Sequence, residues 1–208
     1  LLQVRPGSDG ALALALIDVV ITDKLYDEAF VRHRTNGSFL VRTDNGKPLT
    51  ESDLTANGSQ QRFVAWDEIT GAPVVYDPST GKFESNSLRP ALFGERLVKT
   101  KDGRAILCRP AFAELAKLAA RYSPETSAAI TYVPASKVKE AAHILTENRP
   151  VSMYMYNGVG QHTNATQTNR GIAVLYALLG DFDQPGGNVV FPKAPMNVVS
   201  GKEFLPRE

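Results

Sequence analysis

The chain has 208 residues, of which 43% are hydrophobic, so it can bury a sizeable core as one large domain or two small ones. Its 23 basic and 22 acidic side chains are well mixed and give a net charge of +1, which provides no electrostatic case for nucleic acid or an anionic membrane as a partner. The apolar run over residues 11–21 is interrupted by Asp18 and is too short to span a bilayer, so we expect no direct membrane insertion.

Few metal-binding side chains are available. The single cysteine, Cys108, excludes an internal disulfide, a four-cysteine zinc site and a cysteine-bound iron–sulfur cluster within this chain. The three histidines lie far apart in the sequence, and none has a carboxylate or a second histidine at ligand spacing. We therefore expect no metal site built by this chain, and we interpret Cys108 as a small buried residue.

The first predicted elements are a short strand over residues 1–4, a loop and a buried helix. The loop is Pro6-Gly-Ser-Asp9, with Ser8 as the expected N-cap and Asp9 at the positive end of the helix dipole. Apolar side chains then cover nearly the whole circumference, which is typical of a helix that is buried or covered on two sides. A second, amphipathic helix is predicted to start within residues 25–31.

Residues 37–109 lose the helical periodicity and alternate between short strand-like runs and turn signals. The predicted turns are Asn45-Gly46, Thr70-Gly71, Thr80-Gly81 and Asp102-Gly103. Turns at this spacing between apolar runs predict successive hairpins. This region is therefore expected to be a β-rich insertion.

Helices are predicted again after Pro110, over residues 111–122, from Ser123 onward and over about 134–148. A short strand over Val151–Tyr156 then leads through a glycine loop to a helix at about 164–179. The strand–loop–helix order at both ends of the chain indicates an α/β fold with Rossmann-like units, interrupted by a β-hairpin-rich insertion.

The glycine loop Asn157-Gly-Val-Gly-Gln-His162 is suited to holding a phosphate, because unpaired N–H groups and the dipole at a helix start favour negative charge. It lacks the third glycine of the usual dinucleotide fingerprint, so a tight turn that only needs glycine backbone angles stays an alternative. The neutral polar side chains around it exceed what capping requires and suit a purine edge, a pterin or a phosphate. They are those of Asn157, Gln161, His162, Thr163, Asn164, Gln167, Thr168 and Asn169. His162 has no nucleophile or orienting carboxylate nearby in the sequence, which favours a hydrogen-bonding role over general-base catalysis.

The loop Pro6-Gly-Ser-Asp9 is of the same type and follows a predicted strand, where ligands of open α/β sheets usually bind. Its alternative interpretation is a turn with a capped helix. Asp9 is suited to accept hydrogen bonds from the N–H groups of a guanine. Two such loops in one chain strengthen the case for both.

Several segments carry a family resemblance when they are taken together. They are Val4-Arg-Pro-Gly-Ser-Asp-Gly-Ala-Leu-Ala13, Leu25–Val31, Tyr122-Ser-Pro-Glu125 with Val133-Pro-Ala135, and Asn157–Asn188 with its Asp183-Gln-Pro-Gly-Gly-Asn188 turn. In this order they resemble the molybdopterin oxidoreductases of the dimethyl sulfoxide reductase superfamily. The resemblance implies an enzyme that binds molybdenum or tungsten through two molybdopterin guanine dinucleotides and catalyses two-electron or oxygen-atom transfer.

The resemblance also implies two groups of cofactor contacts. The group at the guanine nucleotide end is Gly7, Ser8 and Asp9, where Ser8 replaces the usual threonine. The group near the pterin and the pyrophosphate is Asn157, Gly158 and Gln161, with His162 as a weaker member. No metal-ligating residue of the family is placed in this chain.

Members of the family are several times longer, so we expect a central fragment of a multidomain catalytic subunit that is inactive by itself. The expected division is residues 1–36 as the end of one α/β cofactor-binding domain, 37–109 as the insertion, and 110–208 as a helical connection with a second cofactor-binding segment. The rest of the subunit is the expected partner. An iron–sulfur cluster in the parent and an iron–sulfur electron-transfer subunit are compatible with the resemblance.

Two other functional classes stay open from the sequence. One is a non-catalytic nucleotide-binding module, and the other is an interaction domain that docks through the β insertion. The first residue is not a methionine, so any targeting segment is expected outside the chain. The expectation for localisation is a soluble protein, either cytoplasmic or periplasmic.

Overall fold

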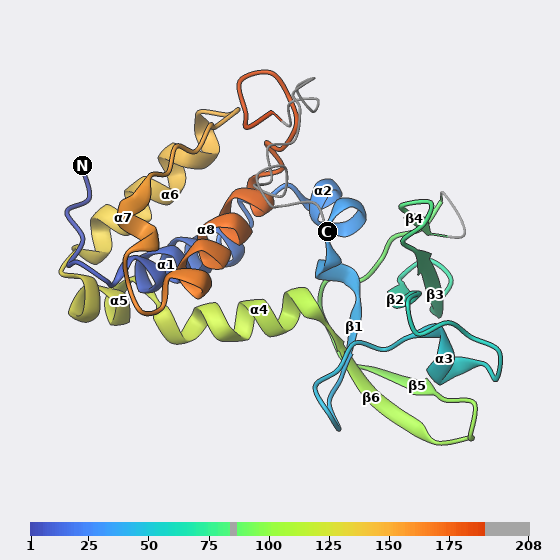
Figure 1. Ribbon diagram of the computed structural model, residues 1–208. Helices are drawn as coiled ribbons and strands as arrows, with labels where there is room; N and C mark the ends of the chain where they lie inside the picture. The colour runs from blue at the N-terminus through green and yellow to red at the C-terminus, as the bar shows by residue number, and fades with distance from the viewer. Residues whose placement is uncertain (84–86, 190–208) are drawn as a thin grey trace, which may run out of the picture.

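The computed structural model describes residues 1–83 and 87–189, and a mainly helical part lies beside a β-rich part (Figure 1). The helical part contains α1 (Asp9–Thr22), α2 (Glu28–Arg34), η1 (Asn36–Ser38), α4 (Ala111–Ala119), η2 (Ala120–Tyr122), α5 (Pro124–Thr131), α6 (Ala135–Glu147), α7 (Asn157–Gly160) and α8 (Ala165–Leu179). The β-rich part contains β1 (Leu40–Arg42), α3 (Glu51–Leu54), β2 (Phe63–Asp67), β3 (Ala72–Asp77), β4 (Lys82–Phe83), β5 (Arg96–Lys99) and β6 (Ala105–Pro110). This mixture of helices and small sheets confirms the predicted α/β class.

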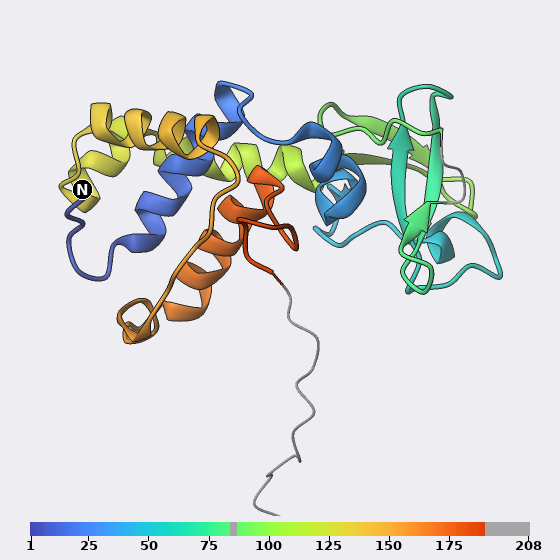
Figure 2. The ribbon, with the colours of Figure 1, turned by 90° about the horizontal axis from the view of Figure 1, so that it is seen from above.

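Helix α1 lies at the centre of the helical part. Its side chains Ala15, Ile17 and Val20 have no exposed surface, and α4, α5, α6 and α8 pack around it. Complete burial of a side chain such as Ile17 or Val20 contributes about 1.5–3 kcal/mol to folding. The prediction of a buried helix is therefore confirmed, and α1 lies beside α8, as the view from above shows (Figure 2).

Ser8 lies directly before α1, but the prediction that its side chain caps the helix is wrong. The Ser8 hydroxyl donates to the carbonyl of Arg5 at 2.7 Å and accepts nothing from the helix N–H groups. At α2 the cap is Asp27, whose carboxylate accepts from the N–H of Phe30 at 2.8 Å, so the helix begins at Glu28, within the predicted range 25–31. Ser123 does cap α5, accepting from the N–H of Thr126 at 3.3 Å.

Neither of the two strands predicted next to the loops forms in the described part of the chain. Residues 1–5 alternate between exposed and half-buried positions, as a strand would, yet they pair with no other strand. Residues 151–156 are likewise outside both sheets. A strand depends on the N–H and C=O groups of a neighbour, and the local sequence pattern could not reveal whether that neighbour lies within these 208 residues.

The β-rich part consists of two antiparallel three-stranded sheets, with the strand orders β1-β6-β5 and β2-β3-β4. The predicted turns Thr70-Gly71, Thr80-Gly81 and Asp102-Gly103 join β2 to β3, β3 to β4 and β5 to β6. Their glycines have φ values of +67°, +66° and +82°, where glycine is strongly preferred. Asn45-Gly46 forms the turn after β1, with φ +69° at Gly46. All four predicted turns are confirmed.

The β-rich part has its own core of Leu40, Leu49, Val64, Val98, Ile106 and Cys108. Burial raises the pKa of the Cys108 thiol to about 11. Cys108 is therefore a packed residue without thiolate character, as predicted. The boundaries of the three-segment division of the chain stay a prediction.

An ion-pair network connects the two parts of the molecule. The guanidinium of Arg32, on α2, pairs with Glu28 at 2.8 Å and Glu68 at 3.2 Å, and also donates to the carbonyl of Pro90. Arg89 pairs with the same two glutamates at 3.3 and 3.2 Å. Arg32 is only 9% exposed, but its charge is compensated by these partners. It therefore connects α2 to the β-rich part without an unpaired buried charge. No helix within the described ranges is long and apolar enough to cross a membrane.

Candidate functional site

The loop before α1 lies against the segment that leads into α8. Gly7 has φ +82°, and a Cβ placed on it would lie 3.6 Å from Nδ1 of His162. A Cβ on Gly10 would lie 3.1 Å from Oγ1 of Thr168. The fold therefore brings the two polar loops of the sequence together, although almost the whole chain separates them.

A cavity of about 540 Å³ opens between the first loop and the start of α8, and none of residues 157–162 lines it. Its polar lining comes from Ser8 and from four side chains at the start of α8, namely Asn164, Gln167, Thr168 and Arg170. Its apolar lining comes from α1, α4, α5 and α8 and includes Leu14, Leu118, Ile130 and Val174. No described carboxylate lines it. A cavity with apolar walls and a few convergent polar groups is the usual form of a ligand site.

Thr168 is the most buried of the polar residues that line this cavity. The residue is 4% exposed, and its hydroxyl makes no hydrogen bond within the described ranges. A hydroxyl can donate one hydrogen bond and accept two. The Oγ1 atom of Thr168 is not fully buried, so it can be reached from the cavity. The hydroxyl of Thr168 is therefore available to a ligand, and Gly10 leaves its approach open.

The second loop differs from the prediction in its conformation. Residues 157–160 form one helical turn, α7, before the chain bends into α8. Gly158 and Gly160 do not have positive φ, and a Cβ on either would meet nothing within 4 Å. The alternative of a turn that needs glycine backbone angles is therefore wrong, since neither conformation nor packing in the described chain calls for glycine at these positions.

The predicted contact residues are only partly brought together. Gly7, Ser8 and His162 lie at the junction of the two loops, and Asp9 is half-buried in the first turn of α1. Three others, Asn157, Gly158 and Gln161, are exposed and line none of the described cavities. Their role as cofactor contacts stays a prediction.

Sequence reasoning did not select Gly10 or Arg170 as site residues, whereas Thr168 was among the neutral polar side chains that it noted around the start of this helix. Thr168 follows Asn164 by four residues, a spacing that places both on the same face of a helix. This spacing agrees with the selection of both residues from the sequence. Gly10 was not identifiable, because its importance comes from a side chain far away in the sequence.

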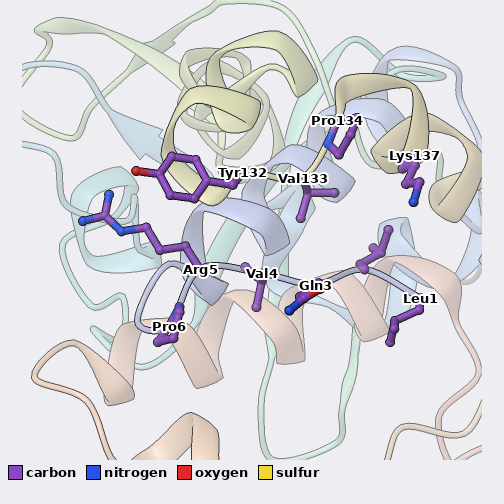
Figure 3. A pocket seen from close by; sticks show the side chains of 10 residues that line it. Leu1, Gln3, Val4, Arg5, Pro6, Tyr132, Val133, Pro134 and Lys137 are labelled. Carbon is purple, nitrogen blue, oxygen red and sulfur yellow. The ribbon is translucent and has the colours of Figure 1, made fainter.

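A second hollow of about 600 Å³ lies on the other side of the first loop, between residues 1–6 and 132–137 (Figure 3). At one end, the guanidinium of Arg5 lies 5.4 Å from the ring centre of Tyr132. Lys137 lies toward the other end, beside Leu1 (Figure 3). Neither cation has a carboxylate partner within the described ranges. This hollow contains none of the predicted contact residues.

A search of curated proteins finds several similar ones. The chain is 33% identical to the perchlorate reductase subunit alpha of Dechloromonas aromatica, over 89% of this chain and 22% of the relative. It is 33% identical to the dimethylsulfide dehydrogenase subunit alpha of Rhodovulum sulfidophilum, over 89% and 20%. It is 31% identical to the chlorate reductase subunit alpha of Ideonella dechloratans, over 88% and 20%. The chain thus spans about a fifth of the length of these relatives.

The other two comparisons add little to this. No protein-family model matches the chain. Among solved structures, the acetylene hydratase from Pelobacter acetylenicus is similar over 89% of this chain and 15% of its own, with a TM-score of 0.49 and 19% identity. The relationship of this chain to other proteins therefore rests on the three sequence similarities and not on this structural similarity.

Proposed function

This chain belongs to the dimethyl sulfoxide reductase superfamily of molybdopterin oxidoreductases, and on that premise we propose that it is a cofactor-binding part of a catalytic subunit. The parent protein would bind molybdenum or tungsten through molybdopterin guanine dinucleotide and catalyse two-electron or oxygen-atom transfer. When bound, that cofactor supplies the redox chemistry, while the protein binds and orients it.

The observation that carries the proposal is the open surroundings of Gly158 and Gly160. Nothing within the described chain requires glycine there, whereas close approach of a ligand to the backbone would. His162, which follows directly, meets Gly7 of the other loop. A ligand that contacts both loops would therefore lie across the starts of α1 and α8.

The chemistry of the lining fits such a cofactor. The N–H groups at the start of α1 and the cation of Arg170 favour a phosphate, and no described carboxylate in the cavity opposes it. The neutral groups of Asn164, Gln167 and Thr168 suit the donors and acceptors of a heterocycle. In this proposal the chain holds the cofactor through hydrogen bonds and helix dipoles and contributes no metal ligand.

Substitutions in the full-length parent test the two loops. Asp9→Ala and Gln161→Ala are each expected to lower the molybdenum or tungsten content and the pterin content of the purified protein. Asn45→Ala is a matched control, because it removes a side-chain hydrogen bond to the N–H of Lys47 in the β-rich part. Normal cofactor content and activity in both loop variants would remove these residues from the site.

The relatives named above are alpha subunits, so we propose that the parent acts with further subunits, including an iron–sulfur electron-transfer subunit. We also propose that residues 37–109 are an insertion without cofactor contacts. Purification of the parent from its native source, followed by iron and subunit analysis, tests the first point. Finding a single subunit without iron would refute it.

A further inference from the structure

The turn over residues 180–188 is a motif of the sequence that the proposed cofactor contacts leave without a role. In the structure this turn packs against residues 149–153, the segment that leads to the second loop. Asn188 makes the most informative contact. Its Oδ1 accepts from the N–H of Met153 at 2.7 Å, and its Nδ2 donates to the carbonyl of Met153 at 3.0 Å. A carboxamide thus satisfies both backbone groups of one residue, as a neighbouring strand would.

Asp181 satisfies one backbone group, an N–H, two residues earlier. Its Oδ2 accepts from the N–H of Val151 at 3.0 Å. Its Oδ1 accepts from the guanidinium of Arg149 at 2.9 Å and from the amide of Gln184 at 2.9 Å. Asp181 is 1% exposed, so a negative charge without these donors would be costly. The hydrogen bond from Arg149 to Asp181 in turn raises the pKa of the guanidinium above its ordinary value.

Two glycines of the turn allow its close packing, both within the turn and against Pro150. A Cβ on Gly187 would lie 2.0 Å from the carbonyl oxygen of Asp181, and one on Gly186, which has φ +86°, would lie 2.6 Å from Cγ of Pro150. The hydroxyl of Ser152 adds a hydrogen bond of 2.7 Å to the carbonyl of Gly186. A larger residue at position 186 would push the turn away from Pro150, and one at position 187 would disrupt the turn itself at Asp181.

The turn is itself anchored to α8. The hydroxyl of Tyr176, a buried residue of that helix, donates to the carbonyl of Asp181 and accepts from the N–H of Asn188. Beyond Met153 the side chains of Tyr154, Met155 and Tyr156 are exposed. Asn188 is thus the last side-chain tether within the described ranges before the chain reaches Asn157.

We infer that Asp181 and Asn188 are positioning residues, whose side chains take the place of a neighbouring strand and set where the segment Asn157–His162 begins. The inference rests on the proposed function, because the segment being positioned is a proposed cofactor loop. It assigns the motif a role in holding the loop and not in touching the ligand. It also accounts for the pairing of a buried aspartate with an asparagine on one turn.

Hydrogen exchange on the full-length protein tests the geometry. Asn188→Ala removes both hydrogen bonds to Met153, and exchange in a peptide covering residues 149–156 is expected to become about tenfold faster. Asn188→Asp, which keeps the acceptor and loses the donor, is expected to restore part of the protection. Asn45→Ala removes an equivalent side-chain hydrogen bond in the β-rich part and should leave this peptide unchanged. Unchanged exchange in Asn188→Ala would overturn the inference.

The cofactor content of the same variants tests whether this positioning matters for cofactor binding. Asn188→Ala is expected to lose cofactor about tenfold more readily on dilution, and Asn188→Asp to be intermediate. Faster exchange with normal cofactor retention would overturn the positioning role, while a loss of cofactor in Gln161→Ala would still support the proposed function. If Asp9→Ala, Gln161→Ala and Asn188→Ala all retain cofactor normally, both the proposed function of the loops and this inference fail.

Discussion

Thr168 offers a substitution that should separate ligand binding from stability. Its hydroxyl faces the cavity without a hydrogen-bond partner in the described chain, so Thr168→Val removes no hydrogen bond from the fold. Local stability of α8 is therefore expected to change by less than about 0.5 kcal/mol. If the cofactor uses this hydroxyl, the lost hydrogen bond weakens its binding by about 1 kcal/mol, or roughly fivefold.

Thr131→Val is the matched control. Thr131 is also fully buried, but its hydroxyl donates to the carbonyl of Ser127 at 2.8 Å and accepts from the N–H of Val133 at 3.2 Å. The same substitution there leaves a buried N–H group without that partner and is expected to destabilise α5 by about 1–3 kcal/mol. Cofactor retention should stay normal as long as the protein remains folded.

Hydrogen exchange of α5 and α8 in the full-length protein measures local stability, and metal loss on dilution measures cofactor retention. We expect Thr168→Val to weaken cofactor retention without destabilising α8. We expect Thr131→Val to destabilise α5 without weakening cofactor retention. Destabilisation by Thr168→Val equal to that by Thr131→Val would refute the idea that its hydroxyl is free. Normal cofactor retention in Thr168→Val would refute a ligand contact at this hydroxyl.

Two further predictions concern the β-rich part. Burial opposes the charge of Asp67, but hydrogen bonds from Thr70 and from the backbone N–H groups of Arg89, Thr70 and Ile69 outweigh it and lower the pKa to about 2. Because the folded pKa lies below the ordinary 3.8, the resulting stabilisation is present above pH 4 and is lost as the pH falls toward 2. Thermal midpoints at pH 5 and pH 3 should therefore differ less in Asp67→Asn than in the unmodified protein, and an equal difference would contradict this. Cys108 should resist iodoacetamide at pH 7 until the protein is unfolded, as mass spectrometry can show, and rapid alkylation of the native protein would argue against its burial.

The sequence identified most of the local structure. The buried helix after Asp9, the Ser123-Pro124 start of α5 and the glycine turns of the hairpins were all predictable. Each depends on residues next to one another in the chain, through apolar periodicity, capping or positive φ. The same local reasoning selected the two polar loops of the candidate site.

Tertiary structure decided which of these features meet. Only the packing of α1 against α8 brings Gly7 to His162 and leaves the hydroxyl of Thr168 without a partner. Only the fold shows that residues 151–153 are held by the side chains of Asp181 and Asn188 and not by a strand. Hydrogen-bond partners and neighbouring backbone are supplied by residues far apart in sequence, and a local pattern contains no information about which distant residue will supply them.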